Sequence, residues 1–369
     1  MEFQPIDLPI IDFSPLEDNN LDQSKELKKI ANNIDVACKR FGVFYVTTSS
    51  FQLHDQNHIF ESSRQFFSLP EEKKNTIPIK SGGFTRGYIG LGNESGSHRF
   101  EVKEAFSYGY EWDPNEQPTN SLQGRNEWGN LQKILGEQWR NTLNKYYDKM
   151  VAISELVVKS LEIALGVELK SHCVGGETIS IMRLFKYYPY NNEISAGSDK
   201  SENIGSSPHT DWGFLTLVLQ QENIQGLQLF YDGQWWDIPS KPATIVVNCG
   251  DYLSLLTRGQ YISPLHRVIS DGTNERYSTV FFYYPAYESK IPMIAQCSNE
   301  LSIFKDQTDK SDTHDENDKE KLLDVCFGES NSIKNSWTNI QGKHCLPEKH
   351  AYEMLVFEYA AMEIRITIV

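Results

Sequence analysis

The chain has 369 residues, 39% of them hydrophobic, and a formal net charge of −15 at neutral pH. This composition is typical of a packed globular protein, in one large domain or two, and excludes a largely disordered chain. The negative charge argues against nucleic acid or an anionic membrane as a partner, and no apolar run approaches the roughly 18 residues of a membrane helix. Since no signal segment or C-x-x-C pair is present, we expect a soluble, cytoplasmic protein, most simply a monomer.

The first part of the chain, residues 1–125, mixes helix and strand patterns. LPIIDFSPL predicts a short buried strand, residues 21–42 an amphipathic helix that ends at Gly42, and VFYVTT a second strand. Asp55–Phe67 predicts another helix. From Ile79 to Tyr110 the chain is rich in Gly and aromatic residues, which favours an irregular loop near a pocket over any regular element.

The middle of the chain changes from a helical to a β pattern. Within residues 126–178, Trp128–Leu165 has apolar residues at helical spacing and predicts a long helix, whole or broken, that backs a sheet and closes at Gly166. Residues 179–300 then carry short β-rich runs separated by turn residues. These are ISIMRLFKYYPY, FLTLVLQ, GLQLFY, QWWDIP, ATIVVNCG, YISPLHRVIS and RYSTVFFYYP.

So many short runs predict a fold that is mainly β with flanking helices (α+β), around a double-stranded β-helix of the jelly-roll, cupin-like kind. Residues 301–369 begin with a charged, aperiodic stretch that suits a mobile acidic insertion. A C-terminal segment that packs back on the body follows it. We expect all four parts to form one compact unit.

The triplet HTD places two metal-ligand types in front of an apolar run. On a strand, His209 and Asp211 share a face. The triplet alone is also common in ordinary loops, so it needs a third ligand. His266, 57 residues further on in another β run, can meet them at a barrel mouth. Two histidines and one carboxylate form the facial triad of non-haem Fe(II) sites, which leaves positions open for oxygen chemistry.

A second constellation follows in RYSTVFFYYP, where Arg276 and Ser278 share a strand face. With Tyr188 of KYYPY they could hold a carboxylate through a charge-assisted pair and two hydroxyl groups. A buried Arg paired with a protein acid, such as Asp251 or Glu275, fits the same pattern. The residues alone leave these two interpretations open.

Together these motifs resemble the Fe(II)- and 2-oxoglutarate-dependent dioxygenases of the isopenicillin N synthase-like superfamily. LPIIDFSPL, FGVFYVTT, RQFFSLPEEKK, RGYIGLGNE and KEAFSYGYEW resemble the N-terminal region of the family. HTDWGFLTLVLQ, GLQLFYDGQWWDIP, VVNCGDYLSLLTRGQYISPLHRV and RYSTVFFYYP resemble its catalytic core. The similarity covers nearly the whole chain, and H-x-D, HRV and R-x-S in series are far more specific than H-x-D alone.

The resemblance implies Fe(II) bound by His209, Asp211 and His266, and the distal carboxylate of 2-oxoglutarate bound by Arg276, Ser278 and the hydroxyl of Tyr188. It further implies O2 as cosubstrate, ascorbate as a stimulant, and release of succinate and CO2 as a substrate C–H bond is oxidised. Hydroxylation, desaturation and ring closure all fit. One position departs from the plant members, which commonly carry Asn where this chain has Lys186. Lys186 could meet an anionic substrate or be an ordinary exposed lysine.

The substrate is expected to be a small metabolite, and several residues are candidates for its pocket. Arg86 and Lys103 could anchor a carboxylate, and aromatic walls could come from Tyr88, Phe106, Phe214, Phe282 and Tyr284. Core packing is the competing role for each aromatic residue. Three other functions stay open from the residues: an oxidase of the same fold that does not use 2-oxoglutarate, a non-catalytic binding protein, and a zinc hydrolase.

Overall fold

The computed structural model describes most of the chain up to residue 289. The described ranges are 3–18, 21–79, 86–93, 100–120, 122–189, 204–270 and 272–289. The predicted acidic insertion and C-terminal segment, residues 301–369, lie outside these ranges.

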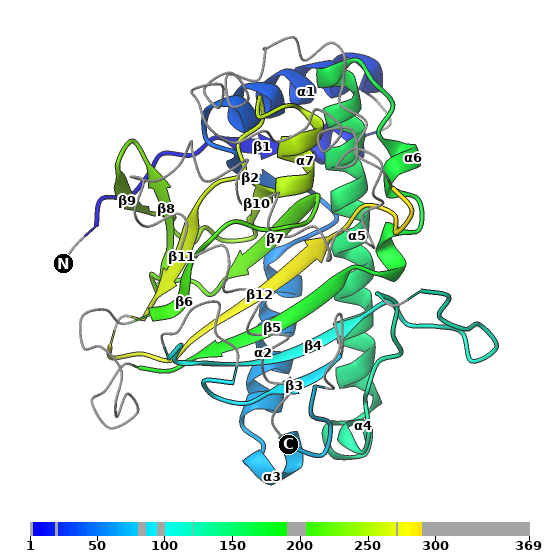
Figure 1. Cartoon of the computed structure of the whole chain (residues 1–369), viewed down its shortest axis with the longest axis vertical. Helices are drawn as coiled ribbons and strands as arrows, with labels where there is room; N and C mark the ends of the chain where they lie inside the picture. Colours follow the sequence, from blue (N-terminus) through cyan, green and yellow to red (C-terminus); the bar gives the residue numbers. More distant parts are fainter. Residues whose placement is uncertain are drawn as a thin grey trace, which may run out of the picture.

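The strands form two sheets that face each other (Figure 1). In spatial order, the larger sheet contains β1 (Ile10–Asp12), β2 (Val43–Thr47), β10 (Ile245–Cys249), β7 (Leu215–Gln220), β12 (Arg276–Tyr283), β5 (Ile181–Tyr187), β4 (Lys103–Gly109) and β3 (Gly87–Ile89). The smaller sheet contains β6 (Ile204–His209), β11 (His266–Ile269), β8 (Leu227–Tyr231) and β9 (Gln234–Asp237). Neighbouring strands run antiparallel except β1 and β2, which are parallel. The arrangement confirms the predicted jelly-roll core.

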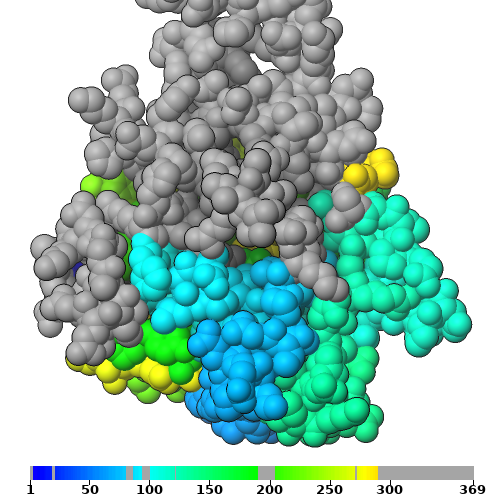
Figure 2. All heavy atoms as spheres, turned by 60° about the horizontal axis from the view of Figure 1, so that its bottom comes forward, coloured from blue at the N-terminus to red at the C-terminus, as the bar shows by residue number. Residues whose placement is uncertain are grey.

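Helices cover the face of the larger sheet that points away from the smaller one. They are α1 (Gln23–Arg40), α2 (Leu53–Phe67), α3 (Glu71–Lys74), α4 (Leu131–Leu135), α5 (Glu137–Leu165), α6 (Lys170–Cys173) and α7 (Asp251–Leu256), with 3₁₀ turns η1 (Ser14–Leu16) and η2 (Gly176–Thr178). Figure 2 shows one end of this layer, where the blue segment of α2 and α3 lies beside the green segment of α4 and α5. In the part of the chain that the structure describes, no helix combines the length and the apolar character needed to cross a bilayer.

The predicted long helix is confirmed, and glycines set its limits. Gly136 has φ +90°, which interrupts the helical backbone and separates α4 from α5. Gly166 ends α5 with φ +66°, in the left-handed region that a residue without Cβ adopts at little cost. The helix runs along the sheet as one long support (Figure 1).

All seven predicted β runs form strands, but the expectation for Ile79–Tyr110 was wrong where the structure describes it. β3 and β4 extend the larger sheet there. Every residue of β4 is buried, so the alternation that marks a half-exposed strand is missing. Its sequence KEAFSYG also contains two charged residues, whose burial is stabilised by ion pairs that the sequence does not reveal.

The apolar core lies on both faces of the larger sheet. On the outer face, side chains of β7, β12, β5 and β4 pack against α1, α2 and α5. On the inner face a second cluster fills the space between the two sheets and includes Phe185, Val218, Val246 and Val280. Because successive strand residues point to opposite faces, these inner residues identify which positions look into the barrel. The site described next is built on that inner face.

Candidate metal centre

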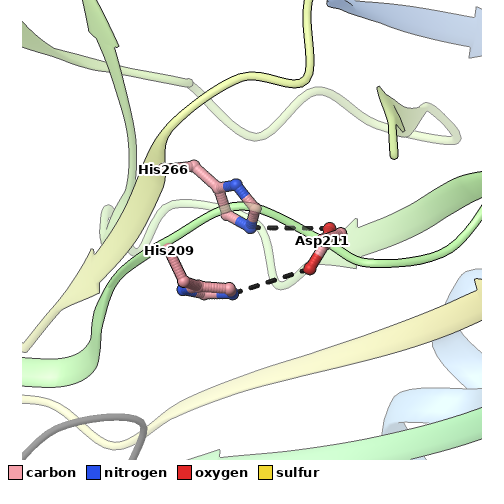
Figure 3. Close-up of side chains that lie close together, drawn as sticks. All are labelled: His209, Asp211 and His266. Atoms are coloured by element: carbon pink, nitrogen blue, oxygen red, sulfur yellow. Dashed lines mark ion pairs between the residues drawn. The ribbon is translucent and has the colours of Figure 1, made fainter. Parts of the chain in front are cut away.

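The three predicted metal ligands converge at one end of the barrel (Figure 3). His209 is the last residue of β6, and His266, the first of β11, is its direct cross-strand partner. Asp211 follows His209 by two residues, where the chain leaves the smaller sheet for β7. Two adjacent strands and the connection to the opposite sheet therefore present the three side chains to one point.

The geometry of these side chains fits a bound metal ion. Nε2 of His209 lies 3.6 Å from Oδ1 of Asp211, and Nε2 of His266 lies 3.6 Å from Oδ2. The three ligand atoms lie within 4.8 Å of one another. Asp211 and His266 are buried, and Oδ2 of Asp211 has no hydrogen-bond partner among the described residues. A buried carboxylate oxygen facing two imidazoles needs a cation, and this donor set is that of non-haem Fe(II) sites.

Hydrogen bonds orient both imidazoles for metal binding. Nδ1 of His209 lies 2.7 Å from the carbonyl of Ser207, and Nδ1 of His266 lies 3.0 Å from that of Pro264. A carbonyl oxygen only accepts, so each Nδ1 carries the proton and donates it. Nε2 of each ring is thereby left with the lone pair that a metal requires.

A buried ion pair supports the strand that carries His209. Oε1 of Glu101 accepts a hydrogen bond of 2.7 Å from the backbone N–H of Ser207, whose carbonyl binds His209. Nζ of Lys103 lies 2.7 Å from Oε2 of Glu101 and donates to Oγ of Ser206. Both charged side chains are buried. Lys103, a candidate substrate anchor in the sequence, is thus paired with Glu101 beside β6.

Arg276 is a buried cation whose hydrogen-bonding groups are mostly unused. Its Nη2 donates to Oε1 of Gln220 at 3.0 Å, and its guanidinium carbon lies 5.0 Å from the centre of the Tyr187 ring. Nε and Nη1 have no partner within the described ranges, and the side chain is only 3% exposed. Burial lowers the pKa of the guanidinium, an effect that Tyr187 partly opposes.

Neither acid that could have paired with Arg276 does so. Asp251 accepts hydrogen bonds from Ser263 and Thr210. Glu275 forms an ion pair of 2.8 Å with Lys186. Among the described residues, no ion pair therefore neutralises Arg276, and its fork of donors fits a carboxylate that enters from solution.

The hydroxyl group beside Arg276 comes from Tyr187, and the prediction for Tyr188 needs correction. Arg276 is the cross-strand partner of Tyr187, and Oγ of Ser278 lies 3.4 Å from the hydroxyl oxygen of Tyr187. Tyr188 instead donates a hydrogen bond of 2.6 Å to Glu104. Neighbouring residues of a strand point to opposite faces, so only one of the two tyrosines can share the face of Arg276. Knowledge of the register between β5 and β12 would have identified it.

Lys186 also lies on the face opposite to Arg276. Its Nζ sits 4.5 Å from the centre of the Tyr188 ring and pairs with Glu275. The side chain is mostly buried, so it is not the exposed lysine that the sequence suggested, and a contact with an anionic substrate stays a prediction.

Three of the predicted aromatic pocket walls belong to the core under the helices instead. Tyr88, Phe106 and Phe214 are all in the outer cluster. The Phe106 ring lies 4.5 Å from that of Phe66 in α2 and 6.0 Å from that of Trp139 in α5. Strand alternation turns Phe106 outward between inward-facing Ala105 and Ser107, which residue type alone could not reveal.

Of the remaining candidates, Phe282 lies on the inner face beside a residue that the sequence analysis missed, whereas Tyr284 belongs to the outer cluster. Phe282 shares the strand face of Arg276, and its ring stacks parallel to that of Tyr284 at 6.5 Å between ring centres. The guanidinium of Arg183, not predicted, lies 5.7 Å from the Phe282 ring. Arg86 is buried beside Gly109, donates to the carbonyl of Leu122, and has its pKa lowered by burial.

Comparisons with known proteins agree with this site. The family model described as "non-haem dioxygenase in morphine synthesis N-terminal" matches residues 8–130, and that of the "2OG-Fe(II) oxygenase superfamily" matches residues 179–285. Clavatol oxidase claD of Penicillium crustosum is 30% identical over 75% of this chain and 85% of its own length. Homoarginine-6-hydroxylase 2-ODD-C23.2 of Arabidopsis thaliana is 29% identical, with 83% of each chain covered.

Solved structures give the same result. A full-length Neurospora crassa protein, crystallised in complex with alpha-KG, superposes with a TM-score of 0.67 at 26% identity, over 81% of this chain and 93% of the Neurospora chain. The second matched region of the sequence, residues 179–285, contains all three residues of the metal centre. The chain therefore belongs to the 2OG-Fe(II) oxygenase superfamily and is a non-haem Fe(II)- and 2-oxoglutarate-dependent dioxygenase.

Proposed function

We propose that His209, Asp211 and His266 hold the Fe(II), and that Arg276, Ser278 and Tyr187 hold the distal carboxylate of 2-oxoglutarate. The observation that carries this assignment is the buried guanidinium of Arg276, two of whose nitrogen atoms have no partner among the described residues. A carboxylate would accept from the fork of Arg276 and from the two hydroxyl groups beside it.

Each group of this chain then has a defined task. The Nδ1–H bonds to Ser207 and Pro264 hold both imidazoles in the ligating tautomer. Gln220 fixes Arg276, whose charge selects a dicarboxylate over a neutral keto compound. The apolar inner cluster keeps water from the reacting carbon. When bound, Fe(II) supplies the coupling of O2 and 2-oxoglutarate to oxidation of a substrate C–H bond, with release of succinate and CO2.

We propose hydroxylation as the outcome for a small-molecule substrate. The name of one relative, homoarginine-6-hydroxylase, supports this choice over desaturation or ring closure. We further propose that the protein works as a cytoplasmic monomer. Nucleic acid is not proposed as a partner, because the net charge of −15 repels polyanions.

The test is an anaerobic titration of the Fe(II) protein with 2-oxoglutarate, followed by the metal-to-ligand absorption band. We expect the band to saturate at one equivalent in the wild type and to require a large excess in Arg276→Gln. Succinate should then form when air is admitted. A protein that binds Fe(II) but produces no band, or that turns over without 2-oxoglutarate, would contradict the proposal. Light scattering of the same sample checks the monomer.

A further inference from the structure

Two polar side chains on the inner face have buried atoms that no group in the described part of the chain satisfies. Oγ1 of Thr216 and Nδ2 of Asn248 both lack a hydrogen-bond partner there. Thr216 is 1% exposed and Asn248 is 2% exposed. Leaving such groups unpaired costs roughly 1–3 kcal/mol each, so we expect a ligand or an ordered water in the barrel to satisfy them.

The two side chains form a pair that looks into the barrel. Thr216 of β7 and Asn248 of β10 are direct cross-strand partners, which places their side chains next to each other on one face. Val218 and Val246, two residues away on each strand, belong to the cluster between the sheets. By strand alternation, Thr216 and Asn248 share that inner face.

The pair lies at the end of the barrel nearest to Asp211. The backbone N–H of Asp251, three residues after Asn248, donates a hydrogen bond of 2.7 Å to the carbonyl of Asp211. On β7 and β12, Ser278 lies opposite Gln220 and Phe282 lies opposite Thr216. Four residues of strand, about 13 Å, therefore separate the pair from the Arg276 end. The co-substrate carboxylate and the Thr216–Asn248 pair occupy opposite ends of the inner face.

The groups around Thr216 and Asn248 indicate which kind of ligand the pair can bind. Nδ2 of an asparagine only donates, so the occupant must offer an acceptor oxygen. Phe282, directly opposite Thr216, presents a ring that is stacked on Tyr284 and approached by Arg183. An aromatic surface beside hydrogen-bond donors is suited to a flat ring that carries a carbonyl or hydroxyl oxygen.

We propose that Thr216 and Asn248 form an oxygen-binding subsite that orients the substrate, a flat ring compound whose carbonyl or hydroxyl oxygen accepts from Asn248 while its ring lies against Phe282. This inference rests on the function proposed above, because it assumes that 2-oxoglutarate occupies the Arg276 end.

The experiment uses the anaerobic Fe(II)–2-oxoglutarate protein and two probes of similar shape, acetophenone and ethylbenzene, which differ by one carbonyl oxygen. Binding is measured as the shift of the metal-to-ligand band. We expect the wild type to prefer acetophenone by about tenfold, the value of one hydrogen bond in a dry site. Thr216→Val and Asn248→Leu should each remove most of that preference without weakening the binding of 2-oxoglutarate.

Thr279→Val is the matched control. Thr279 is equally buried on the neighbouring strand, but it faces the helices and bonds to the hydroxyl of Tyr146 at 2.7 Å. Its replacement should lower the melting temperature and leave both probe affinities unchanged. Thr216→Val should not lower the melting temperature, since no hydrogen bond is lost.

Three results would overturn the subsite. If the wild type binds both probes equally, the pair holds a buried water only. If it binds neither probe, the pocket does not take flat rings. If the Thr216 and Asn248 variants lose affinity for 2-oxoglutarate instead, the pair serves the co-substrate. Failure of the proposed function is distinguishable, because the band would then be missing before any probe is added.

Discussion

The two faces of the larger sheet differ in whether the hydrogen bonds of their buried polar groups are satisfied. On the outer face, Glu104 accepts hydrogen bonds from Tyr88 and Tyr188, both at 2.6 Å, and pairs with Lys74 at 2.5 Å. On the inner face, Arg276, Thr216 and Asn248 have atoms without a partner in the part of the chain that the structure describes. Both sets are largely buried, so exposure does not distinguish them.

If the proposed sites are right, this difference separates residues that serve folding from residues that serve binding. A polar cluster that satisfies itself is complete when the chain has folded. A buried donor without a partner costs stability and is retained only where a ligand or an ordered water completes it. Substitutions on the outer face should therefore change stability, and substitutions on the inner face should change binding.

The largest expected effect follows from removing an inner ligand of the metal. His266→Ala should lower the affinity for Fe(II) by more than about 100-fold, since even the loss of a group behind a ligand costs about 10–100-fold. Turnover should fall below detection. Metal titration followed by absorption checks the affinity, and circular dichroism checks that the fold is kept. An unchanged affinity would show that the three side chains do not form the centre.

The second comparison replaces one buried cation on each face. Arg276→Gln should raise the KM for 2-oxoglutarate by about 10–100-fold, the loss of a charged hydrogen bond, with little loss of stability. Lys74→Met on the outer face should leave KM unchanged but destabilise the fold by about 3 kcal/mol, because Glu104 loses its partner. Steady-state kinetics and urea unfolding measure both. If Arg276→Gln and Lys74→Met change KM and stability to the same extent, the proposed difference between the two faces is wrong.

The third comparison replaces one aromatic side chain on each face. Phe106→Ala should lower the free energy of unfolding by about 3–5 kcal/mol, because it opens a cavity between α2 and α5. Phe282→Ala, partly exposed at the inner face, should cost less stability and should uncouple succinate formation from substrate oxidation. If Phe106→Ala uncouples succinate formation from substrate oxidation at a temperature where the variant is folded, Phe106 lines the substrate pocket and is not only a core residue.

The smallest expected effect compares two buried glutamates of the same strand region. Glu101→Gln and Glu104→Gln each deprive a buried lysine of its partner, so both should lower stability by about 3 kcal/mol. Only Glu101 contacts the backbone that holds His209. Glu101→Gln alone should weaken Co(II) binding, by about tenfold, as measured from the visible absorption of Co(II). Equal affinities in the two variants would leave Glu101 with a structural role only.

Much of the fold and the metal centre could be predicted because they depend on local patterns. Runs of β-branched and aromatic residues between turn residues predicted seven strands, and helical spacing up to Gly166 predicted α4 and α5. The ligands also follow from local chemistry, since His209 and Asp211 lie two apart and His266 begins a strand. β3 and β4 were not predicted, because a strand buried on both faces lacks the alternation of apolar and polar residues.

Side-chain chemistry and short spacings along the chain predicted the three metal ligands and the Arg-x-Ser strand, and the family resemblance of these motifs implied the class of reaction. Other facts needed the folded molecule: Tyr187 and not Tyr188 faces Arg276, and Phe106 serves the core. The unsatisfied pair of Thr216 and Asn248 is visible only there as well. These facts depend on cross-strand register between segments far apart in the chain, and a shift of one residue would turn each side chain to the other face.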